Sequence, residues 1–289
     1  MPKDQSHLIV RRLIINRIQP IYVLLLAVLL LAACAPTAPT AVDGKLIVVS
    51  TVSPITNIIY NISGDHINLT GIVPEGVNSH TFEPAPSDAI KLAQADLIFV
   101  NGLSLEEPTV KLAEANKKDG AKIIALGEQT ITPDEYMYDF SFPKEAGSPN
   151  PHLWPNPIYA LRYAEIIRDN LIRRDSANAD YYNQNYDAFK VRIEALDKAI
   201  QDTINSIPEQ NRRLLTYHDS FAYFAPRYGM TVIGAIQPSD FAEPSAQDVE
   251  NVLSGNPQHR PPLSSSRAGR PVHRGRLCGK PQAPFSKDR

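Results

Sequence analysis

Short apolar runs alternate with longer amphipathic stretches through the first half of the chain. Four runs rich in β-branched residues are predicted as strands, at residues 46–50, 67–73, 97–101 and 122–126. Helices are expected between them, one beginning at Ser87 and Asp88 and another over residues 107–115. Strands that alternate with helices predict an α/β fold with a parallel sheet covered by helices on both faces. In such sheets, ligands bind beyond the carboxyl ends of the strands.

A long helical region follows a polar loop at residues 127–151. It is predicted to begin near Pro157, to break around Ala177 and to end near Ile207. Apolar residues recur every three or four positions in its second part, at Tyr182, Tyr186, Phe189, Ile193, Leu196, Ile200, Ile204 and Ile207. This stripe indicates a helix that faces the core. At about 1.5 Å per residue, roughly 30 residues give a helix of about 45 Å, which is long enough to pass along two lobes.

A second α/β unit begins after this helix. Its pattern predicts strands at 213–217 and 230–235, a helix at 220–228 and another helix beginning near Ser245. From Asn256 onward the sequence is rich in Pro and basic residues and has no apolar periodicity, so it cannot supply further strands. The abrupt change indicates a truncation or a shift of reading frame. A basic tail that binds anionic lipid, with Cys278 as an exposed thiol, is the alternative.

The N-terminus has the organisation of an export signal. Arg11, Arg12 and Arg17 precede an apolar run at residues 21–33, which is short for a membrane span. The run ends in Leu-Ala-Ala-Cys34, which resembles the lipobox of bacterial lipoproteins. The resemblance implies that Cys34 is lipidated and that residues 35–44 form a tether, with general secretion as the expected route and twin-arginine export as the alternative.

Composition narrows the class of function. The 289-residue chain has a formal net charge of -2, which argues against nucleic acid as the main partner because phosphate binding requires a concentrated basic surface. Eight Lys or Arg residues lie from Asn256 onward against one acid, Asp288, so the preceding part is acidic and suits a cationic ligand. With only two cysteines, no disulfide is expected in the mature body if Cys34 is acylated.

Three of the seven histidines occupy positions where a ligand of this fold is expected. His80 lies in a turn-rich loop after the second predicted strand, His152 precedes the long helices, and His218 follows the strand at 213–217. Taken singly, each is more often a hydrogen-bonded loop histidine than a metal ligand. Their separations of 72 and 66 residues match no compact zinc module, so the spacing alone leaves their role open.

Several motifs together resemble the metal-specific solute-binding proteins of bacterial ABC importers, solute-binding protein family nine. The resemblance runs from about Lys45 to Gly255. The matching segments occur in the family's order: Val-Ser-Thr-Val-Ser-Pro at 49–54, the loop at 74–84 with Ser87-Asp88, Asn-Gly-Leu-Ser-Leu-Glu at 101–106, Pro-His-Leu-Trp at 151–154 with Asn156-Pro157, His-Asp-Ser-Phe at 218–221 with Tyr223-Phe224, and Tyr228-Gly229.

The resemblance implies a non-enzymatic, monomeric receptor that carries a divalent metal ion to an ABC permease. It implies two lobes, each a small parallel sheet flanked by helices, joined by one long backbone helix, with a truncated second lobe here. The family's ligands carry over to His80, His152 and His218. Its fourth ligand, a carboxylate late in the second lobe, has no counterpart because the basic tail replaces that region. His218 favours zinc (Zn²⁺), with manganese (Mn²⁺) as the alternative, since family members that bind manganese or iron usually have Glu there.

The implied organisation divides the chain into six segments. They are a lipoprotein signal peptide at 1–34, a tether at 35–44, an N-terminal metal-binding lobe at 45–175, an interlobe helix at 176–207, a partial C-terminal lobe at 208–255 and an atypical basic tail at 256–289.

Two other functions compete with the receptor. Three histidines with an open fourth position also hold catalytic zinc, as in a hydrolase or hydratase, although no His-Glu-x-x-His motif is present. The other is an adhesin-like surface lipoprotein with structural metal. Substitute carboxylates would come from Glu83, Asp219, Asp240 or Glu243, each more simply explained as a surface or cap residue. The remaining histidines, His7, His66, His259 and His273, are not expected to bind metal, and His66 is expected to be solvated at a turn.

Overall fold

A computed structural model describes residues 44–237 and 241–254 of the chain. The chain divides into two compact units, residues 1–45 and 46–289, and everything below concerns the second. The signal peptide, Cys34, most of the tether and the basic tail lie outside the described residues, as do Asp240, His7, His259, His273 and Cys278. Among the helices that are described, none combines the length and the apolar character needed to cross a membrane.

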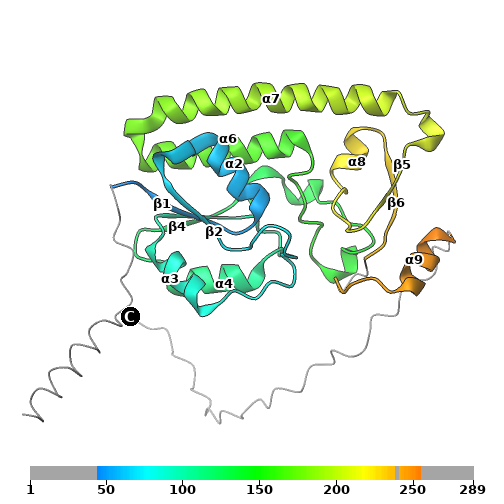
Figure 1. Cartoon of the computed structure of the whole chain (residues 1–289), viewed down its shortest axis with the longest axis horizontal. Coiled ribbons are helices and arrows are strands. Elements are labelled where there is room, and N and C mark those ends of the chain that lie inside the picture. The colour runs from blue at the N-terminus through cyan, green and yellow to red at the C-terminus, as the bar shows by residue number, and fades with distance from the viewer. Residues whose placement is uncertain (1–43, 238–240, 255–289) are drawn as a thin grey trace, which may run out of the picture. The chain divides into compact units, whose positions relative to one another are not determined.

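The first lobe is built on a four-stranded parallel sheet (Figure 1). Its strands are β1 (Ile47–Ser50), β2 (Asn68–Gly71), β3 (Leu97–Val100) and β4 (Lys122–Ala125), in the order β2-β1-β3-β4. In register, Val48 pairs with Leu69 on one side and with Leu97 on the other. The predicted strands and their parallel arrangement are therefore confirmed, each strand being slightly shorter than the apolar run that marks it.

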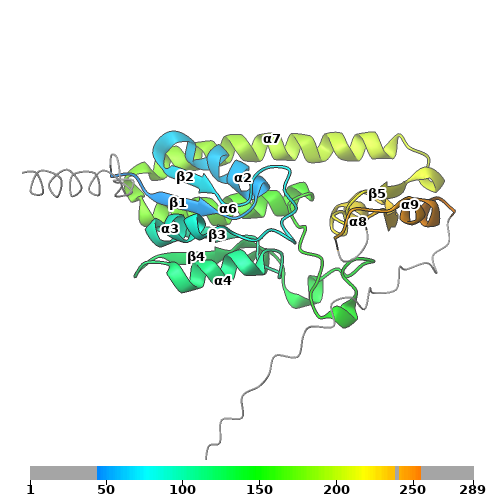
Figure 2. The same cartoon turned by 60° about the horizontal axis from the view of Figure 1, so that its bottom comes forward.

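Helices cover both faces of this sheet, as Figure 2 shows. On one face Val48 and Phe99 pack against the helices α2 (Ser53–Ser63), α6 (Pro157–Arg174) and α7 (Ala179–Asn205). On the other face, Val49, Ile98 and Val100 pack against the helices α3 (Pro86–Gln94) and α4 (Glu107–Asn116). Because successive strand residues point to opposite faces, the continuous apolar runs supply both cores.

Proline sets the starts of four of these helices, at Pro54, Pro86, Pro108 and Pro157. Its fixed φ suits the first helical turn, where its missing N–H has no partner to lose. At α6, Asn156 is also the N-cap, because its side-chain oxygen accepts a hydrogen bond from the Ile158 N–H at 3.0 Å. The capped start of α6 fixes the end of the loop that contains His152.

The helix α7 extends from the first lobe to the second (Figure 1). It follows a 3-10 turn at Ser176–Asn178, which confirms the predicted break. The apolar stripe is buried at Tyr182 and Phe189 near its start and at Ile204 near its end, whereas Leu196 in the middle is 49% exposed. The prediction of a continuous core-facing stripe is therefore wrong at its centre.

The second lobe contains a two-stranded parallel sheet within the described residues. It is formed by β5 (Arg213–Thr216) and β6 (Thr231–Ala235), with a bulge at Ile233 where the register shifts. The short helix α8 (Phe224–Arg227) lies between the strands in sequence, and α9 (Ala246–Leu253) follows them. The two-lobed α/β class is thus confirmed.

Two predicted segments differ from the structure. The predicted helix at 220–228 contains only α8, and the Asp219 carbonyl, which would close the first turn of the longer helix, accepts a hydrogen bond from Asn150 Nδ2 instead. The predicted loop at 127–151 contains further turns, α5 (Leu126–Thr130), Pro133–Glu135 and Lys144–Ala146. These short helical turns contain too few residues for a 3.6-residue periodicity to be recognised in the sequence.

Candidate metal centre

His80 lies in the loop between β2 and α3. Two residues before it, the Asn78 side-chain oxygen accepts a hydrogen bond from the His80 backbone N–H at 3.0 Å. This closes a local turn of the kind that Asn favours. The imidazole ring stacks on Phe241 of the second lobe, with ring centroids 4.1 Å apart and an interplanar angle of 4°.

His152 is 3% exposed and is held by Asn150, which precedes it by the same interval. The Asn150 oxygen Oδ1 accepts from the His152 backbone N–H at 2.9 Å and from its ring Nδ1–H at 2.8 Å. The assignment of the amide is fixed because its Nδ2 donates to two acceptors, Asp139 Oδ2 at 2.6 Å and the Asp219 carbonyl at 2.8 Å. With Nδ1 protonated, His152 Nε2 carries the free lone pair.

His218 follows β5, and Gln237 follows the neighbouring strand β6. The His218 Nδ1–H donates to Gln237 Oε1 at 2.7 Å, and Gln237 Nε2 donates in turn to the Phe241 carbonyl at 2.9 Å. The parallel pairing of the two strands brings their carboxyl ends together, so one strand end supplies the ring and the other its orienting amide. His218 Nε2 is therefore also a free acceptor.

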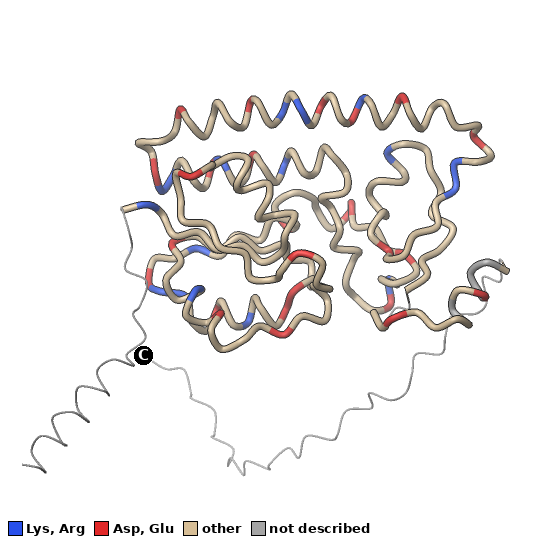
Figure 3. Tube along the Cα trace, in the orientation of Figure 1, with Lys and Arg blue, Asp and Glu red and all other residues tan. Residues whose placement is uncertain are grey.

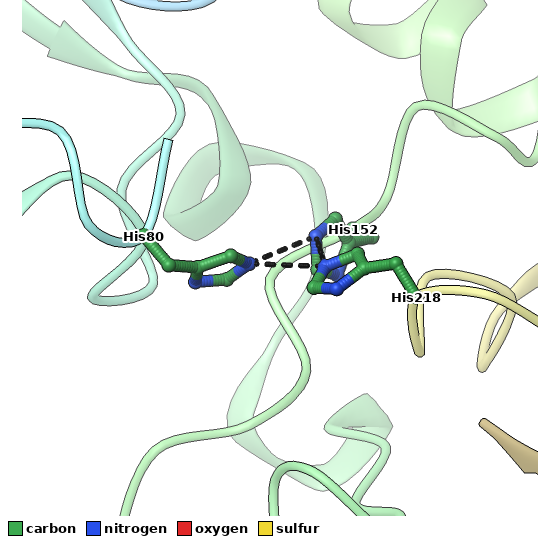
Figure 4. A group of neighbouring side chains, drawn as sticks. All are labelled: His80, His152 and His218. Atoms are coloured by element: carbon green, nitrogen blue, oxygen red, sulfur yellow. Dashed lines mark hydrogen bonds between the residues drawn. The ribbon is translucent and has the colours of Figure 1, made fainter. Parts of the chain in front are cut away.

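The three rings meet at one point, as Figure 4 shows. The Nε2 atom of His80 lies 3.2 Å from that of His152 and 3.2 Å from that of His218, and the latter two are 3.0 Å apart. Two lone pairs that face each other at this distance repel unless a cation lies between them. In a tetrahedral zinc site with bonds of about 2.0–2.1 Å, ligand nitrogens are about 3.3 Å apart. The donor set and its spacing therefore fit one divalent ion held by three neutral imidazoles.

Burial keeps these imidazoles neutral. Desolvation, with a smaller contribution from His218, lowers the pKa of His80 to about 3. Burial also lowers the pKa of His152 well below its usual value. The pKa of His218 is lowered by burial too, although its bond to Gln237 opposes the shift. Since only the neutral ring offers a lone pair, the rings are prepared to bind a cation.

Aromatic rings surround the histidines. Trp154 meets the His152 ring edge-on, with centroids 5.2 Å apart, and Phe142 lies 5.5 Å from the His80 ring centroid. A cavity of about 750 Å³ opens beside the histidines and is also lined by Glu75, Tyr217 and Glu243. The site thus combines apolar walls with a few polar groups, as small-ligand sites generally do.

Within the described residues, no carboxylate joins the three histidines as a possible metal ligand. Glu83 and Glu243 are exposed, as their interpretation as surface residues requires. Asp219 differs from that expectation, because it is 1% exposed and accepts a hydrogen bond from the Ser141 N–H at 3.1 Å. It lies close to Asp139, whose pKa burial and the Asp219 charge raise to about 7.

His66 is not the solvated turn residue that its sequence context suggests. It is partly buried, its Nδ1 is 2.9 Å from Asn178 Oδ1, and its ring stacks on Tyr181 with centroids 3.9 Å apart. It lies outside the histidine cluster and supports the packing of α7 against the first lobe.

A buried network behind His152 was not predicted from the sequence. Asn101 Nδ2 donates to the Pro151 carbonyl at 3.0 Å, and Asn101 Oδ1 accepts from Tyr163 Oη–H at 2.8 Å. Glu106 accepts from the Asn101 backbone N–H at 2.6 Å and from Thr51 Oγ1–H at 2.5 Å. The network residues Asn101 and Glu106 begin and end the family-like segment at 101–106, which lies between β3 and α4. Asn78 and Asn150 could have been identified from the sequence, because each precedes a histidine in the same Asn-x-His spacing.

Comparisons with known proteins identify the family of the chain. Residues 48–259 match the family described as ZnuA, zinc-uptake complex component A, periplasmic. The chain is 35% identical over 205 residues to the metal ABC transporter substrate-binding lipoprotein FimA of Streptococcus parasanguinis, covering 69% of this chain and 65% of FimA. It is 36% identical over 221 residues to the manganese ABC transporter substrate-binding lipoprotein PsaA of Streptococcus anginosus, covering 74% and 70%.

A solved structure shows the same fold. The periplasmic zinc-binding protein TroA of Treponema pallidum superposes with a TM-score of 0.65 at 26% identity, over 73% of this chain and 74% of TroA. The chain spans about two thirds of the length of the curated relatives named above. The family consists of binding components of transporters and not of enzymes, in agreement with the sequence prediction. The chain belongs to the ZnuA family of metal-specific solute-binding proteins of ABC importers.

Proposed function

We propose that this protein captures a divalent transition metal ion at His80, His152 and His218 and delivers it to an ABC permease. The convergence of three Nε2 atoms from two lobes carries the proposal, because the free lone pairs of His152 and His218 face each other at 3.0 Å and His80 Nε2 lies 3.2 Å from both. An ion bound there takes His80 and His152 from the first lobe and His218 from the second. Binding would then stabilise the contact between the lobes, and the permease would have to separate them to release the ion.

Zinc is the preferred cargo in this proposal, and manganese is the alternative. Three imidazole nitrogens at tetrahedral spacing suit zinc, and TroA is titled a zinc-binding protein. Against this, PsaA is named as a manganese protein, and manganese prefers oxygen-rich sites. The fourth ligand in the proposal is water or a carboxylate outside the described residues.

We further propose export as a lipoprotein, with residues 1–34 as the signal peptide and Cys34 as the lipid-bearing residue. FimA and PsaA are both named as lipoproteins. In this arrangement residues 35–44 tether the metal-binding lobe at 45–175, the interlobe helix at 176–207 and the partial second lobe at 208–255 to the outer face of a membrane. The segment at 256–289 remains proposed as an atypical tail. The mature protein is expected to be a monomer.

Metal titration of single variants tests the site. Chelator-stripped protein is titrated with Zn²⁺ and with Mn²⁺ by calorimetry, and H80A, H152A and H218A are each expected to lose at least about 100-fold in zinc affinity because one of three ligands is removed. H66A removes a histidine outside the cluster and is the matched control. Zinc affinities of the three ligand variants within threefold of that of H66A would contradict the site.

The same titration tests whether zinc or manganese is the cargo. Nitrogen sites bind Zn²⁺ more tightly than Mn²⁺ in general, so a preference for zinc of only about tenfold or less would favour manganese as the cargo. If the protein is a receptor, its zinc-bound form should not hydrolyse ester or phosphate substrates. Hydrolysis that H152A abolishes would instead favour the zinc hydrolase.

A further inference from the structure

Asn150 connects a proposed metal ligand directly to the second lobe. Its side chain is fully buried, and it makes four hydrogen bonds, two through Oδ1 and two through Nδ2. An amide has two donor hydrogens and two acceptor lone pairs, so every bonding position of Asn150 is used. The oxygen holds the His152 backbone and ring, and the nitrogen holds the Asp139 carboxylate and the Asp219 carbonyl. The planar amide therefore cannot turn to serve one side without losing its bonds on the other.

Two other asparagines near the site show what is particular to Asn150. Asn78 makes the same turn before His80, but its bond goes to the backbone N–H and not to the ring. Asn156 donates to the second lobe, to the Tyr223 carbonyl at 3.0 Å, but its oxygen caps α6 and does not contact His152. Asn150 combines the two functions that these residues perform separately.

The residue on the other side of this link is next to another proposed ligand. The Asp219 carbonyl that accepts from Asn150 belongs to the residue directly after His218. Asp219 is further fixed by the Ser141 N–H, which donates to its carboxylate. A path of hydrogen bonds thus runs from the His152 ring through one amide to the backbone beside His218, without passing through the metal position.

We propose that Asn150 is a positioning residue that couples the orientation of His152 to closure of the second lobe. This inference rests on the proposed function, because it requires His152 and His218 to bind the ion. When the lobes separate, Nδ2 loses the Asp219 carbonyl, and the amide that selects the His152 tautomer keeps three of its four bonds and is held less firmly. Opening would then weaken His152 as a ligand while His218 is withdrawn, so that the ion loses two ligands in one movement.

The experiment compares the full-length wild-type protein with N150S and N156S, using Zn²⁺ alone as the probe. Ser can still close the local turn before His152 but is too short to bridge to Asp219. Ser is also a good N-cap, so N156S keeps the cap and removes only the bond to Tyr223. Zinc release into excess chelator is followed by fluorescence of Trp154, the single tryptophan, and hydrogen exchange reports on residues 218–224 with and without zinc.

N150S is expected to lose about 10- to 100-fold in zinc affinity, the usual effect of removing the group that orients a ligand, mainly through faster release. It should also lose the zinc-dependent protection of residues 218–224. N156S should release zinc within about threefold of the wild-type rate and retain that protection. Protection is compared within each variant between its zinc-bound and zinc-free forms, so a general loss of stability does not imitate the effect.

Zinc release from N150S at the rate of N156S, with protection of residues 218–224 intact, would overturn the coupling. N150D is the second variant if N150S folds poorly. It keeps an oxygen toward His152 but has no hydrogen to donate to Asp219, and loss of the zinc-dependent protection is again expected. A wild-type protein that shows neither zinc-dependent fluorescence nor zinc-dependent protection would instead refute the proposed metal function itself.

Discussion

At the residue scale, neutral amides and not carboxylates orient two of the three rings of the candidate site, those of His152 and His218. Asn150 accepts from His152 and Gln237 accepts from His218, whereas a carboxylate partner would raise the basicity of each ring further. Amide partners fix the tautomer with less gain in metal affinity. This suits a protein that has to release its ion as well as capture it.

Replacing the three site histidines by Gln should reduce the acid sensitivity of the metal-free protein. The pKa of His80 falls to about 3 in the folded state, and those of His152 and His218 are also lowered. Their unfolded pKa is about 6.5. The unfolded chain therefore binds more protons as the pH falls below 6.5, and stability is lost down to about pH 3.

Thermal unfolding at pH 7.5 and pH 5.0 in the presence of chelator measures the effect. The wild-type melting temperature should fall by at least about 5 °C more than that of the triple Gln variant, since about 1 kcal/mol corresponds to roughly 2–4 °C for a protein of this size. An equal fall in both proteins would show that folding does not lower the pKa values of these histidines.

Glu106 should affect stability in the opposite direction to the histidines, and E106Q tests this. Burial raises the pKa of Glu106 to about 7, although hydrogen bonds from Thr51 and Asn101 oppose the shift, and its Oε2 atom has no partner. Between pH 4.5 and 7 the unfolded chain loses this proton while the folded state retains it, so the wild-type protein loses stability as the pH rises. E106Q should therefore gain stability relative to the wild type between pH 5 and pH 7.5, measured by urea unfolding. A constant difference across that range would mean that Glu106 is ionised throughout.

The junction after β3 is the most constrained local element near the site. Gly102, Leu103 and Ser104 all have positive φ, at 78°, 51° and 61°. Two consecutive non-glycine residues in this region are costly, and such strain persists only where the surroundings impose it. Here the Leu103 N–H donates to Glu128 at 2.8 Å. This bond holds the tight loop that leads directly to Glu106 and the start of α4.

The elements that could be predicted from sequence are those with a strong periodic pattern. The strands of the first sheet could be predicted because apolar residues follow one another there. The break before α7 could be predicted because it separates two helical stretches. The exposed centre of α7 at Leu196 was missed because an apolar stripe does not reveal whether a partner covers it along its whole length. Likewise the three histidines could be named from their motifs, and Asn150 from the repeated Asn-x-His spacing. Gln237 could not, since this amide follows no such pattern and its role depends on which atoms it meets.

Asp197 links α7 to the second lobe. Arg227 donates to both of its carboxylate oxygens, at 2.7 and 2.6 Å, and Tyr228 Oη–H donates at 2.6 Å. Hydrogen bonding from Arg227 lowers the pKa of Asp197, although burial opposes the shift. D197A should reduce the free energy of unfolding by about 1–2 kcal/mol, because it removes a bidentate pair and leaves the Tyr228 hydroxyl without its partner.

K198A provides the matched control for D197A in urea unfolding. Lys198 pairs with Asp202 on the same helix, with both side chains largely exposed, so its removal should change the free energy of unfolding by less than about 0.5 kcal/mol. A loss in K198A equal to that in D197A would contradict a specific role for the contact with α8.

At the scale of the molecule, the carboxyl ends of the two described parallel sheets lie at one site. The loop after β2 contains His80, the junction after β3 supports the His152 loop through Asn101, and the ends of β5 and β6 provide His218 and Gln237. Each sheet follows the rule for ligand position in open α/β folds, and the two sites coincide. An ion bound there would therefore be coupled to the stability of both lobes.

Zinc should stabilise the two lobes together, and H218A should separate them. At a free zinc concentration 1,000 times the Kd, binding to the folded state adds about 4 kcal/mol and raises the melting temperature by roughly 8–16 °C. In the wild type, hydrogen exchange should slow in β3 and in β5 alike, and chelator should reverse both effects. H218A retains His80 and His152, so residual zinc should still slow exchange in β3 but leave β5 unchanged. Zinc that slows exchange in β5 of H218A as much as in the wild type would mean that the ion acts on the second lobe without His218, and the bridging geometry would have to be abandoned.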